Sequence, residues 1–352
     1  MVMQAMVRNG GDVMRSMVMA CGGGGVIRPL VTAGGVAVRQ TGMAGARGIT
    51  VTTRSMSSTF SLPYTVPTGP WGENRSARLE LAAAYRGLDQ LNLNEGVCNH
   101  LSVMTPRADG KEGSVMLVVN YGLHWSEVTA SGLLGVDGEA ELVEGEGEPD
   151  IAASCIHLGI RKVRPDARVV MHTHQPYATA LACLKDPTLL MVHQNSTRFY
   201  QRVAYDHCYS GLALAMDEGN RLGKALGAIM LQELVDSNSK LERNDLNLHQ
   251  MSNQMPLVLG GTGDKDVLFM GHHGVIVVAQ SVALAFDNLY YLERAAHVQI
   301  LAQSTQKEVE LLPEEECQKT SQDLWRDIKK YSDGQFYSMY RRLRQTQPDF
   351  EL

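Results

Sequence analysis

The chain has 352 residues, of which 44% are hydrophobic and 20% are charged, and its formal net charge at pH 7 is −6. A chain of this size can bury a full core, as one α/β domain with extensions or as two domains. Its net negative charge gives no support for nucleic acid as a partner, and no apolar run reaches the roughly 18 residues that a membrane helix needs. Six cysteines without a C-x-x-C spacing argue against a thiolate zinc site and a disulfide framework, and they fit a reducing compartment.

Residues 1–70 have the composition of an organellar transit peptide. They contain six arginines and no lysine, and their one acidic residue is Asp12. Such arginine-rich, acid-poor and serine-bearing segments are typical of transit peptides, and the run 53–58 resembles a processing site. We therefore expect delivery to mitochondria, with a plastid or the cytoplasm as alternatives. A disordered extension without an address is the other interpretation that this composition allows.

From Glu73 onward the hydrophobic pattern is that of a folded domain. Apolar residues at helical spacing predict an amphipathic first helix with Asn74 or Ser76 as its cap. Asp150 and Ser281 are expected to cap two later helices. The expected helices cover residues 78–91, 150–163, 176–184, 218–226, 281–303 and 314–344. The expected strands cover residues 101–104, 115–119, 169–174, 189–193 and 267–271.

Two segments differ in composition from the rest of the folded part. Residues 228–266 are polar and rich in Asn and Gln, so we interpret them as an insertion. Residues 304–352 form a charged C-terminal extension that is helical over most of its length. The domain that carries the chemistry is therefore expected between residues 73 and 303.

The pair His172 and His174, in the expected strand 169–174, is the most informative motif of the chain. Side chains two positions apart on a strand point to the same face, so the two imidazoles project together. Neutral imidazole binds zinc and its neighbours in the first transition row, and open catalytic sites commonly have three protein ligands. The alternative is two partly exposed strand histidines whose rings bind backbone carbonyl groups.

A third ligand is available about a hundred residues later, where the expected strand 267–271 runs into His272, His273 and Gly274. Glycine at this point allows another backbone segment or a ligand to come close. A second histidine cluster at a strand end favours a metal site over the structural alternative. Zinc is the expected metal, although another divalent transition metal is possible.

Several segments together resemble the class II aldolase/adducin family, and its adducin-head branch most closely. They are Asn-His-Leu-Ser at 99–102, Glu-Val-Thr-Ala-Ser at 127–131, Arg-Pro-Asp-Ala at 164–167, His-Thr-His at 172–174 and His-Gly-Val at 273–275. The segments occur in this order within residues 73–303. The resemblance marks that range as one class II aldolase/adducin-like domain.

The resemblance implies an α/β fold, a three-layer α/β/α sandwich around a mostly antiparallel central sheet, commonly assembled as a homo-oligomeric tetramer. It also implies that His172, His174 and His273 bind the metal and that His272 does not. The implied activity is that of a zinc-dependent lyase, acting on a small hydroxy-carbonyl or sugar-phosphate-like substrate through a metal-stabilised enediolate. The residues implied to contact the substrate, which are also common turn residues, are Asn99, Ser102, Thr129, Ser131 and Gly132.

The chain departs from the enzymes of the family at the catalytic acid. In the aldolases this residue stands four positions ahead of the match to His157, where this chain has Ala153. A dehydratase branch instead has a glutamate in the region matching 193–195, which ends here in Asn195. Neither side chain can transfer a proton. Candidates for the catalytic group are Tyr209, His193 and Glu148, whereas Asp150 is better explained as a helix cap.

The missing acid leaves a second hypothesis open, a non-catalytic adducin-like scaffold that assembles as an oligomer and engages actin. Adducin heads are not known for catalysis, although they can retain the histidine motifs. The sequence to Leu352 contains no lysine-rich tail of the kind through which adducins bind actin, and its acidity offers no basic patch. We therefore favour the enzyme, with actin as a partner only under the alternative.

Overall fold

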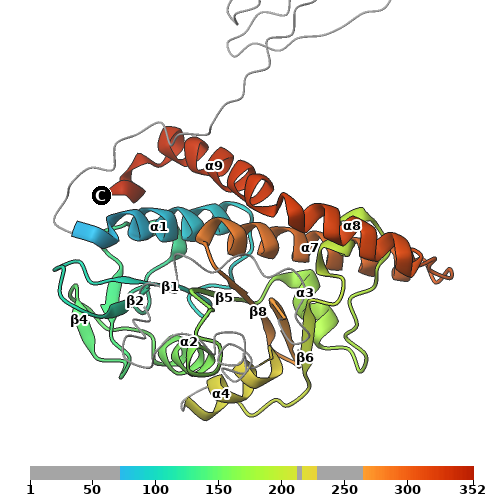
Figure 1. The fold of residues 1–352 in the computed structure, drawn as a ribbon, viewed down its shortest axis with the longest axis horizontal. Helices are drawn as coiled ribbons and strands as arrows, with labels where there is room; N and C mark the ends of the chain where they lie inside the picture. Colours follow the sequence, from blue (N-terminus) through green and yellow to red (C-terminus); the bar gives the residue numbers. More distant parts are fainter. Residues whose placement is uncertain (1–71, 212–215, 228–264) are drawn as a thin grey trace, which may run out of the picture. The chain divides into compact units, whose positions relative to one another are not determined.

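A computed structural model describes residues 72–211, 216–227 and 265–352 (Figure 1). These residues belong to one compact unit, Tyr64–Leu352. The expected transit peptide and nearly all of the expected insertion 228–266 lie outside the described residues. None of the described helices combines the length and apolar character needed to cross a membrane.

The described residues form one central sheet of eight strands in the order β4-β3-β2-β1-β5-β8-β7-β6. Every neighbouring pair is antiparallel except β6 and β7, which are parallel. The strands are β1 His100–Pro106, β2 Ser114–Val118, β3 Leu134–Val136, β4 Leu142–Glu144, β5 Val169–Thr173, β6 Val203–Asp206, β7 Val267–Met270 and β8 Gly274–Ala279. β5, which carries the histidine motif, therefore lies at the centre of the sheet between β1 and β8.

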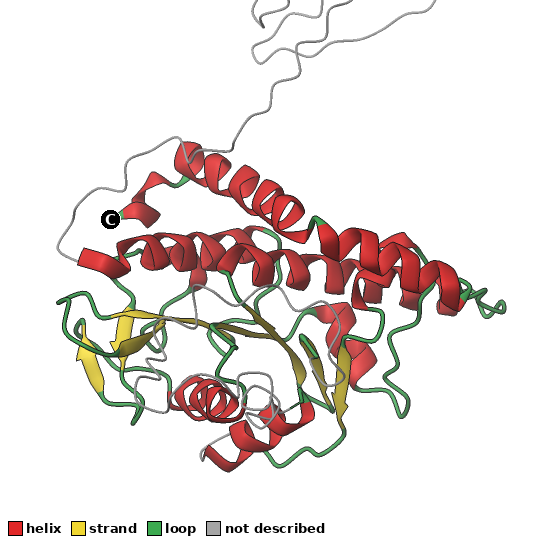
Figure 2. Ribbon diagram, in the orientation of Figure 1, coloured by secondary structure: helices red, strands yellow, loops and turns green. Residues whose placement is uncertain are grey.

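Helices cover both faces of this sheet, as Figure 2 shows. Helices α1, α7 and α9 lie on one side, and α2 and α4 lie on the other (Figure 1). The α-helices are α1 Arg75–Gln90, α2 Ile151–Val163, α3 Pro176–Ala182, α4 Met216–Ala225, α7 Val282–Ser304, α8 Glu314–Arg326 and α9 Ile328–Thr346. The 3-10 helices are η1 Gly72–Asn74, η2 Trp125–Glu127, η3 Gln194–Phe199 and η4 Pro348–Glu351. The predicted three-layer α/β/α sandwich with a mostly antiparallel sheet is confirmed.

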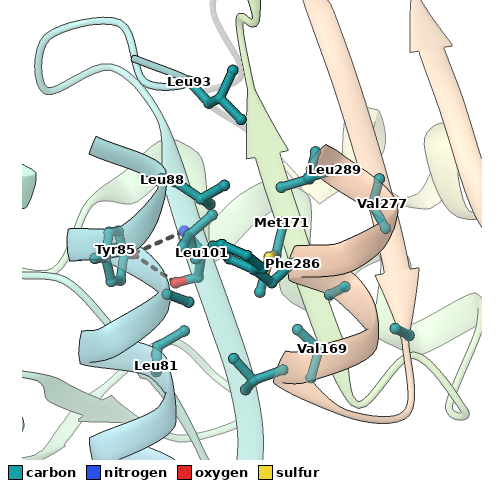
Figure 3. Close-up of a cluster of buried hydrophobic side chains, with 14 of the residues drawn as sticks. Leu81, Tyr85, Leu88, Leu93, Leu101, Val169, Met171, Val277, Phe286 and Leu289 are labelled. Atoms are coloured by element: carbon teal, nitrogen blue, oxygen red, sulfur yellow. Dashed lines mark hydrogen bonds between the residues drawn. The ribbon is translucent and has the colours of Figure 1, made fainter. Parts of the chain in front are cut away.

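The period-two alternation of β5 separates two cores. Val169 and Met171 pack with α1 and α7, whereas Val170 packs on the other face with residues of α2 and α4. Figure 3 shows the first of these cores, in which Leu88 of α1 and Phe286 of α7 approach Met171. Burial of each such side chain contributes roughly 1.5–3 kcal/mol.

The Tyr85 hydroxyl ties α1 to the end of β1. It accepts a hydrogen bond from the Leu101 amide at 2.8 Å and donates one to the Leu101 carbonyl at 2.7 Å (Figure 3). The β1–β2 register begins only at Val103, so Leu101 has no partner on β2. The tyrosine therefore satisfies backbone groups that the sheet leaves open.

Two predicted caps are confirmed and a third acts differently. The Asp150 carboxylate accepts from the amides of Ala152 and Ala153 at the start of α2, and the Ser281 hydroxyl accepts from the Leu284 amide at the start of α7. Asn74 precedes α1 without a side-chain cap. Its side chain bonds Glu144 instead, inside a buried ion-pair network with Arg78.

The strand predicted at 189–193 is wrong. Its backbone amides bond side chains rather than a neighbouring strand: Leu189 donates to the Tyr205 hydroxyl and Leu190 to the Gln299 amide oxygen. Leu189 is buried and the rest of the run is half-buried, and side-chain acceptors, one of them Gln299 of α7, satisfy its backbone in place of a ladder. Periodicity alone does not separate these two outcomes.

The C-terminal segment forms the predicted helical structure, as α8 and α9. Residues from α9 and η4 complete the core above α1 and α7, namely Phe336, Tyr340, Leu343 and Phe350. The Trp325 indole of α8 donates to the Arg198 carbonyl of η3 at 2.9 Å. These helices therefore close one face of the central layer.

Candidate metal centre

The two strand-end histidines of the sequence motif meet the third histidine at one end of the central strands. His172 lies on β5, His174 follows the last residue of β5, and His273 lies in the turn between β7 and β8. The turn passes through His272 in the left-handed region, with φ of 57°. At Gly274, a Cβ atom would lie 2.6 Å from the Thr173 carbonyl oxygen and 2.7 Å from the His174 ring. Glycine is therefore required for this close approach, as predicted.

One ring nitrogen from each histidine converges on a common point. The ligand atoms of His172, His174 and His273 all lie within 4.8 Å of one another, and the Nε2 atoms of His172 and His174 are 3.0 Å apart. Two imidazole nitrogens bound to one tetrahedral zinc ion, at roughly 2.0–2.1 Å each, lie about 3.3 Å apart. The cluster therefore has the size of a three-histidine metal site.

The other ring nitrogens of two of these histidines are already occupied. The Nδ1 atom of His172 is 3.1 Å from the Val275 carbonyl oxygen, and that of His174 is 2.6 Å from Oε2 of Glu95. Both acceptors require a proton on Nδ1, which leaves the lone pair on Nε2. These two contacts thus favour, in His172 and His174, the tautomer with the proton on Nδ1, which is the one that can bind a metal through Nε2.

Desolvation favours the neutral form of two of these imidazoles, those of His172 and His273. Desolvation, followed by the neighbouring His100 and His273, holds the pKa of His172 well below its ordinary value. Desolvation and the nearby His174 lower the pKa of His273 to about 4. Neutral imidazole is the form that binds a metal.

Behind the three histidines, a row of buried polar side chains crosses from the sheet to α2. The His100 ring lies 4.9 Å from that of His172, and its Nδ1 is 2.9 Å from Nε2 of His157. Nδ1 of His157 is 2.6 Å from the Ser102 hydroxyl, which also accepts from the Arg161 guanidinium at 2.9 Å. His157 is thus a packed residue with both ring nitrogens bonded, and Ser102 is held inside the protein by two partners.

The position of the missing acid lies in an apolar setting. Ala153 is fully buried and packs with Val118 and Leu134. Its backbone amide donates to the Asp150 carboxylate, which is occupied as the cap of α2. In the described structure, no carboxylate on α2 replaces the acid that the aldolases have at this point.

The three residues predicted as candidates for the catalytic group form no hydrogen bond with the histidine cluster in the described structure. Tyr209 is 57% exposed, and the Glu148 backbone bonds Tyr121 and Asn120 at the chain bend before α2. His193 precedes η3, and desolvation lowers its pKa. Among the described residues, none of the three forms a hydrogen bond to His172, His174 or His273, so their catalytic role stays a prediction.

Of the predicted substrate residues, Ser102 lies in the buried row described above, and the other four fall into two groups. The first group is Asn99 alone. The Asn99 side-chain oxygen accepts from the amides of Glu95 and His174, at 2.8 and 3.2 Å. Its Nδ2 atom is buried and has no hydrogen-bond partner, so it is a donor available to a ligand.

The second group consists of Thr129, Ser131 and Gly132. These residues lie in a loop whose backbone donors already bond other residues of this chain. The amides of Ala130 and Ser131 donate to the carbonyl oxygens of Phe350 and Leu352, and the Gly132 amide donates to the Thr129 hydroxyl at 3.1 Å. These backbone donors are therefore unavailable to a substrate in this conformation. A role for the side chains in substrate binding stays a prediction.

One residue of the site was missed from the sequence. Glu95 lies in the loop between α1 and β1, and it contacts His174, which is 79 positions away along the chain. The only signal was an acidic residue in a turn-forming Asn-Glu-Gly run close to Asn99.

Together these features define a three-histidine cluster that could hold a metal ion, at the end of the central strands of an α/β/α sandwich. The model of the class II aldolase and adducin N-terminal domain matches residues 79–300, and the chain belongs to that family. Members of the family generally use a divalent metal, bind small molecules and commonly form oligomers.

Known proteins of both branches are similar to this chain. An adducin-related protein of Schizosaccharomyces pombe is 28% identical over 236 residues, which cover 64% of this chain and 59% of the yeast protein. A decarboxylase of Streptomyces niveus is 29% identical over 203 residues, which cover 57% of this chain and 60% of that protein. The crystal structure of an aldolase II superfamily protein from Pseudomonas syringae has a TM-score of 0.63 and 27% identity, and the match covers 80% of this chain and 96% of that one. This chain thus spans less than two thirds of the length of these two curated relatives.

Proposed function

We propose that this chain is a metal-dependent lyase that binds zinc through His172, His174 and His273 and cleaves a small hydroxylated or carboxylated carbonyl compound. The observation that carries the proposal is the convergence of three imidazoles, in two of which Nδ1 is bonded to another acceptor while the Nε2 atoms face each other at 3.0 Å. A metal ion shared by the two rings would accommodate this close approach of the two nitrogen atoms.

A bound zinc ion would polarise the carbonyl oxygen of the substrate and stabilise the enediolate or enolate left when a carbon–carbon bond breaks. Desolvation lowers the pKa of His172 and His273 and so favours the neutral form that binds a metal. The open Nδ2–H of Asn99, whose side-chain oxygen bonds the His174 amide, would donate to a substrate oxygen and orient it.

The lack of a carboxylate at 153 favours one member of this reaction class. Retro-aldol cleavage needs a base to remove a hydroxyl proton, whereas decarboxylation of a β-keto acid needs only an electron sink. In decarboxylation the carbon–carbon bond electrons pass to the carbonyl, CO2 leaves without a proton, and water then protonates the enolate carbon. The similarity to a decarboxylase supports the same choice.

The test begins with zinc content per subunit, measured by elemental analysis on the full chain purified without affinity-tag histidines. Near-stoichiometric zinc in the wild type, lost in His273→Ala, is expected. CO2 release is then compared for a panel of β-keto acids, and cleavage is measured for hydroxy-carbonyl phosphates. A wild-type protein without bound divalent metal, at intact fold, contradicts the proposal.

A second candidate is an adducin-like oligomeric scaffold without catalysis. The apolar packing of Ala153 and the similarity to an adducin-related protein favour it. In that case the assembly state, measured by light scattering, should not depend on metal and should be unchanged in His172→Ala. The same should hold for any co-sedimentation with actin filaments. Turnover of any substrate that disappears in that variant while the assembly persists excludes the scaffold as the sole role.

We further propose a mitochondrial location, which the arginine-rich and acid-poor residues 1–70 support. A fluorescent protein fused after residue 70 is expected to colocalise with a mitochondrial stain. A diffuse cytoplasmic signal contradicts this location.

A further inference from the structure

We propose that Glu95 is the positioning residue of the metal centre: its carboxylate fixes the His174 ring so that Nε2 faces the metal. The inference rests on the proposed metal site, and it assigns a role to a residue outside the histidine motifs. The contact that carries it is the hydrogen bond of 2.6 Å from Nδ1 of His174 to Oε2 of Glu95.

His174 needs support that His172 does not. His172 lies inside β5, where pairing with β1 and β8 fixes its backbone on both sides. His174 lies one residue beyond the end of the strand, past the last registered pair, Thr173 with Val275. Its ring orientation therefore depends on contacts made outside the sheet.

Those contacts come from the loop between α1 and β1. The Asn99 side-chain oxygen accepts from the backbone amides of both His174 and Glu95, and the Glu95 carbonyl accepts from the Cys98 amide at 3.2 Å. The loop turns through Gly96, whose φ is 56°. One asparagine thus holds the ligand and its carboxylate partner in register with each other.

Electrostatics give the Glu95 carboxylate a second effect. Three neutral imidazoles contribute no charge to offset a divalent cation, and Ala153 stands where the aldolases have an acid. The Glu95 carboxylate, hydrogen-bonded to a ligand, makes the His174 imidazole a stronger electron donor. Its side chain is 67% exposed, whereas that of His174 is 15% exposed, so Glu95 faces the open side of the site.

The test measures zinc affinity of the full chain by competition with a chromophoric chelator, for Glu95→Ala, Glu95→Gln and wild type. Removal of a carboxylate that orients a ligand typically weakens metal binding 10–100-fold, and we expect a loss of that order for Glu95→Ala. Glu95→Gln should lose less, because its amide oxygen still accepts from Nδ1 but carries no charge. Glu112→Gln, an exposed glutamate on the β1–β2 loop, is the matched control and should bind as the wild type does.

Absorption of the cobalt-substituted protein gives a readout that a merely structural role would not move. In Glu95→Ala the His174 ring is no longer held in one orientation, which should change the intensity and position of the ligand-field bands. In Glu95→Gln these bands should return part of the way to those of the wild type. Wild-type affinity and spectrum in folded Glu95→Ala overturn this inference while leaving the metal site intact. A wild type that binds no metal refutes the proposed function itself, and the inference with it.

Discussion

Acidification of the metal-free protein should unfold it because of the buried imidazoles. His100 is 2% exposed, and desolvation, with smaller contributions from His174 and His273, lowers its pKa from 6.5 to about 4 against the opposing field of Asp150. In the unfolded chain its pKa returns to about 6.5. Between these two values the unfolded state therefore holds a proton that the folded state does not.

The sign follows from this proton difference. Stability rises with pH wherever the unfolded state binds more protons, so the contribution of His100 is complete above about pH 6.5 and is lost as the pH falls toward 4. With a folded pKa of about 4, the loss at pH 5 is about 2 kcal/mol for His100. Burial also lowers the pKa of His157 and His172, so their losses have the same sign.

The assay is urea unfolding of the chelator-treated protein at pH 5, 6, 7 and 8. The contribution of His100 to the unfolding free energy of the wild type should fall below pH 6.5, by about 2 kcal/mol at pH 5. In His100→Gln one titrating group is absent, so the slope near pH 5 should decrease by up to about 1.4 kcal/mol per pH unit. Parallel pH profiles for wild type and variant would refute the assignment of a neutral buried His100.

Three further substitutions test buried contacts of the fold by thermal and urea unfolding. Ala153→Glu places a carboxylate among Val118 and Leu134. The variant should lose several kcal/mol of unfolding free energy or fail to fold. Wild-type stability of this variant would show that the position still accepts an acid. Tyr85→Phe leaves the Leu101 amide and carbonyl unpaired, and it should cost about 1–3 kcal/mol, so an unchanged midpoint would contradict this bond. Arg78→Met strips the buried Glu144 of its ion pair, and it should cost about 3–5 kcal/mol, with a neutral result refuting the pairing.

Periodicity predicted the long helices and four of the eight described strands, and it missed β3, β4, β6 and β8. Helices such as α7 bury residues at helical spacing over many turns, and Asp150 and Ser281 mark where two helices begin. Strands β3 and β4 have three residues each and are too short for an alternating pattern to emerge. The segment 189–193 has the composition of a strand, yet the side chains of Tyr205 and Gln299 decide its conformation.

The candidate site was predictable where its residues are adjacent in sequence or follow a motif. The histidine pair is visible because a strand fixes their relative directions, and the turn at Gly274 is visible because it ends a buried strand. The row behind the site was not predictable, because it depends on the register that pairs His100 of β1 with His172 of β5. Glu95 was not predictable either, because a loop conformation and not a sequence pattern brings it to His174.

The energetics of the histidine cluster bear on the choice between enzyme and scaffold. Five imidazoles are gathered here, those of His100, His157, His172, His174 and His273. Burial of neutral imidazoles weakens the fold as the pH falls, and an assembly surface could be built from apolar residues without that cost. A bound metal would offset it, since a ligand that binds only the folded state adds stability by mass action. Proteins commonly place such strained clusters of titratable groups at functional sites. The cluster therefore favours a metal centre in either reading, and the acid missing at Ala153 bears on whether such a centre is catalytic and on which reaction it could support.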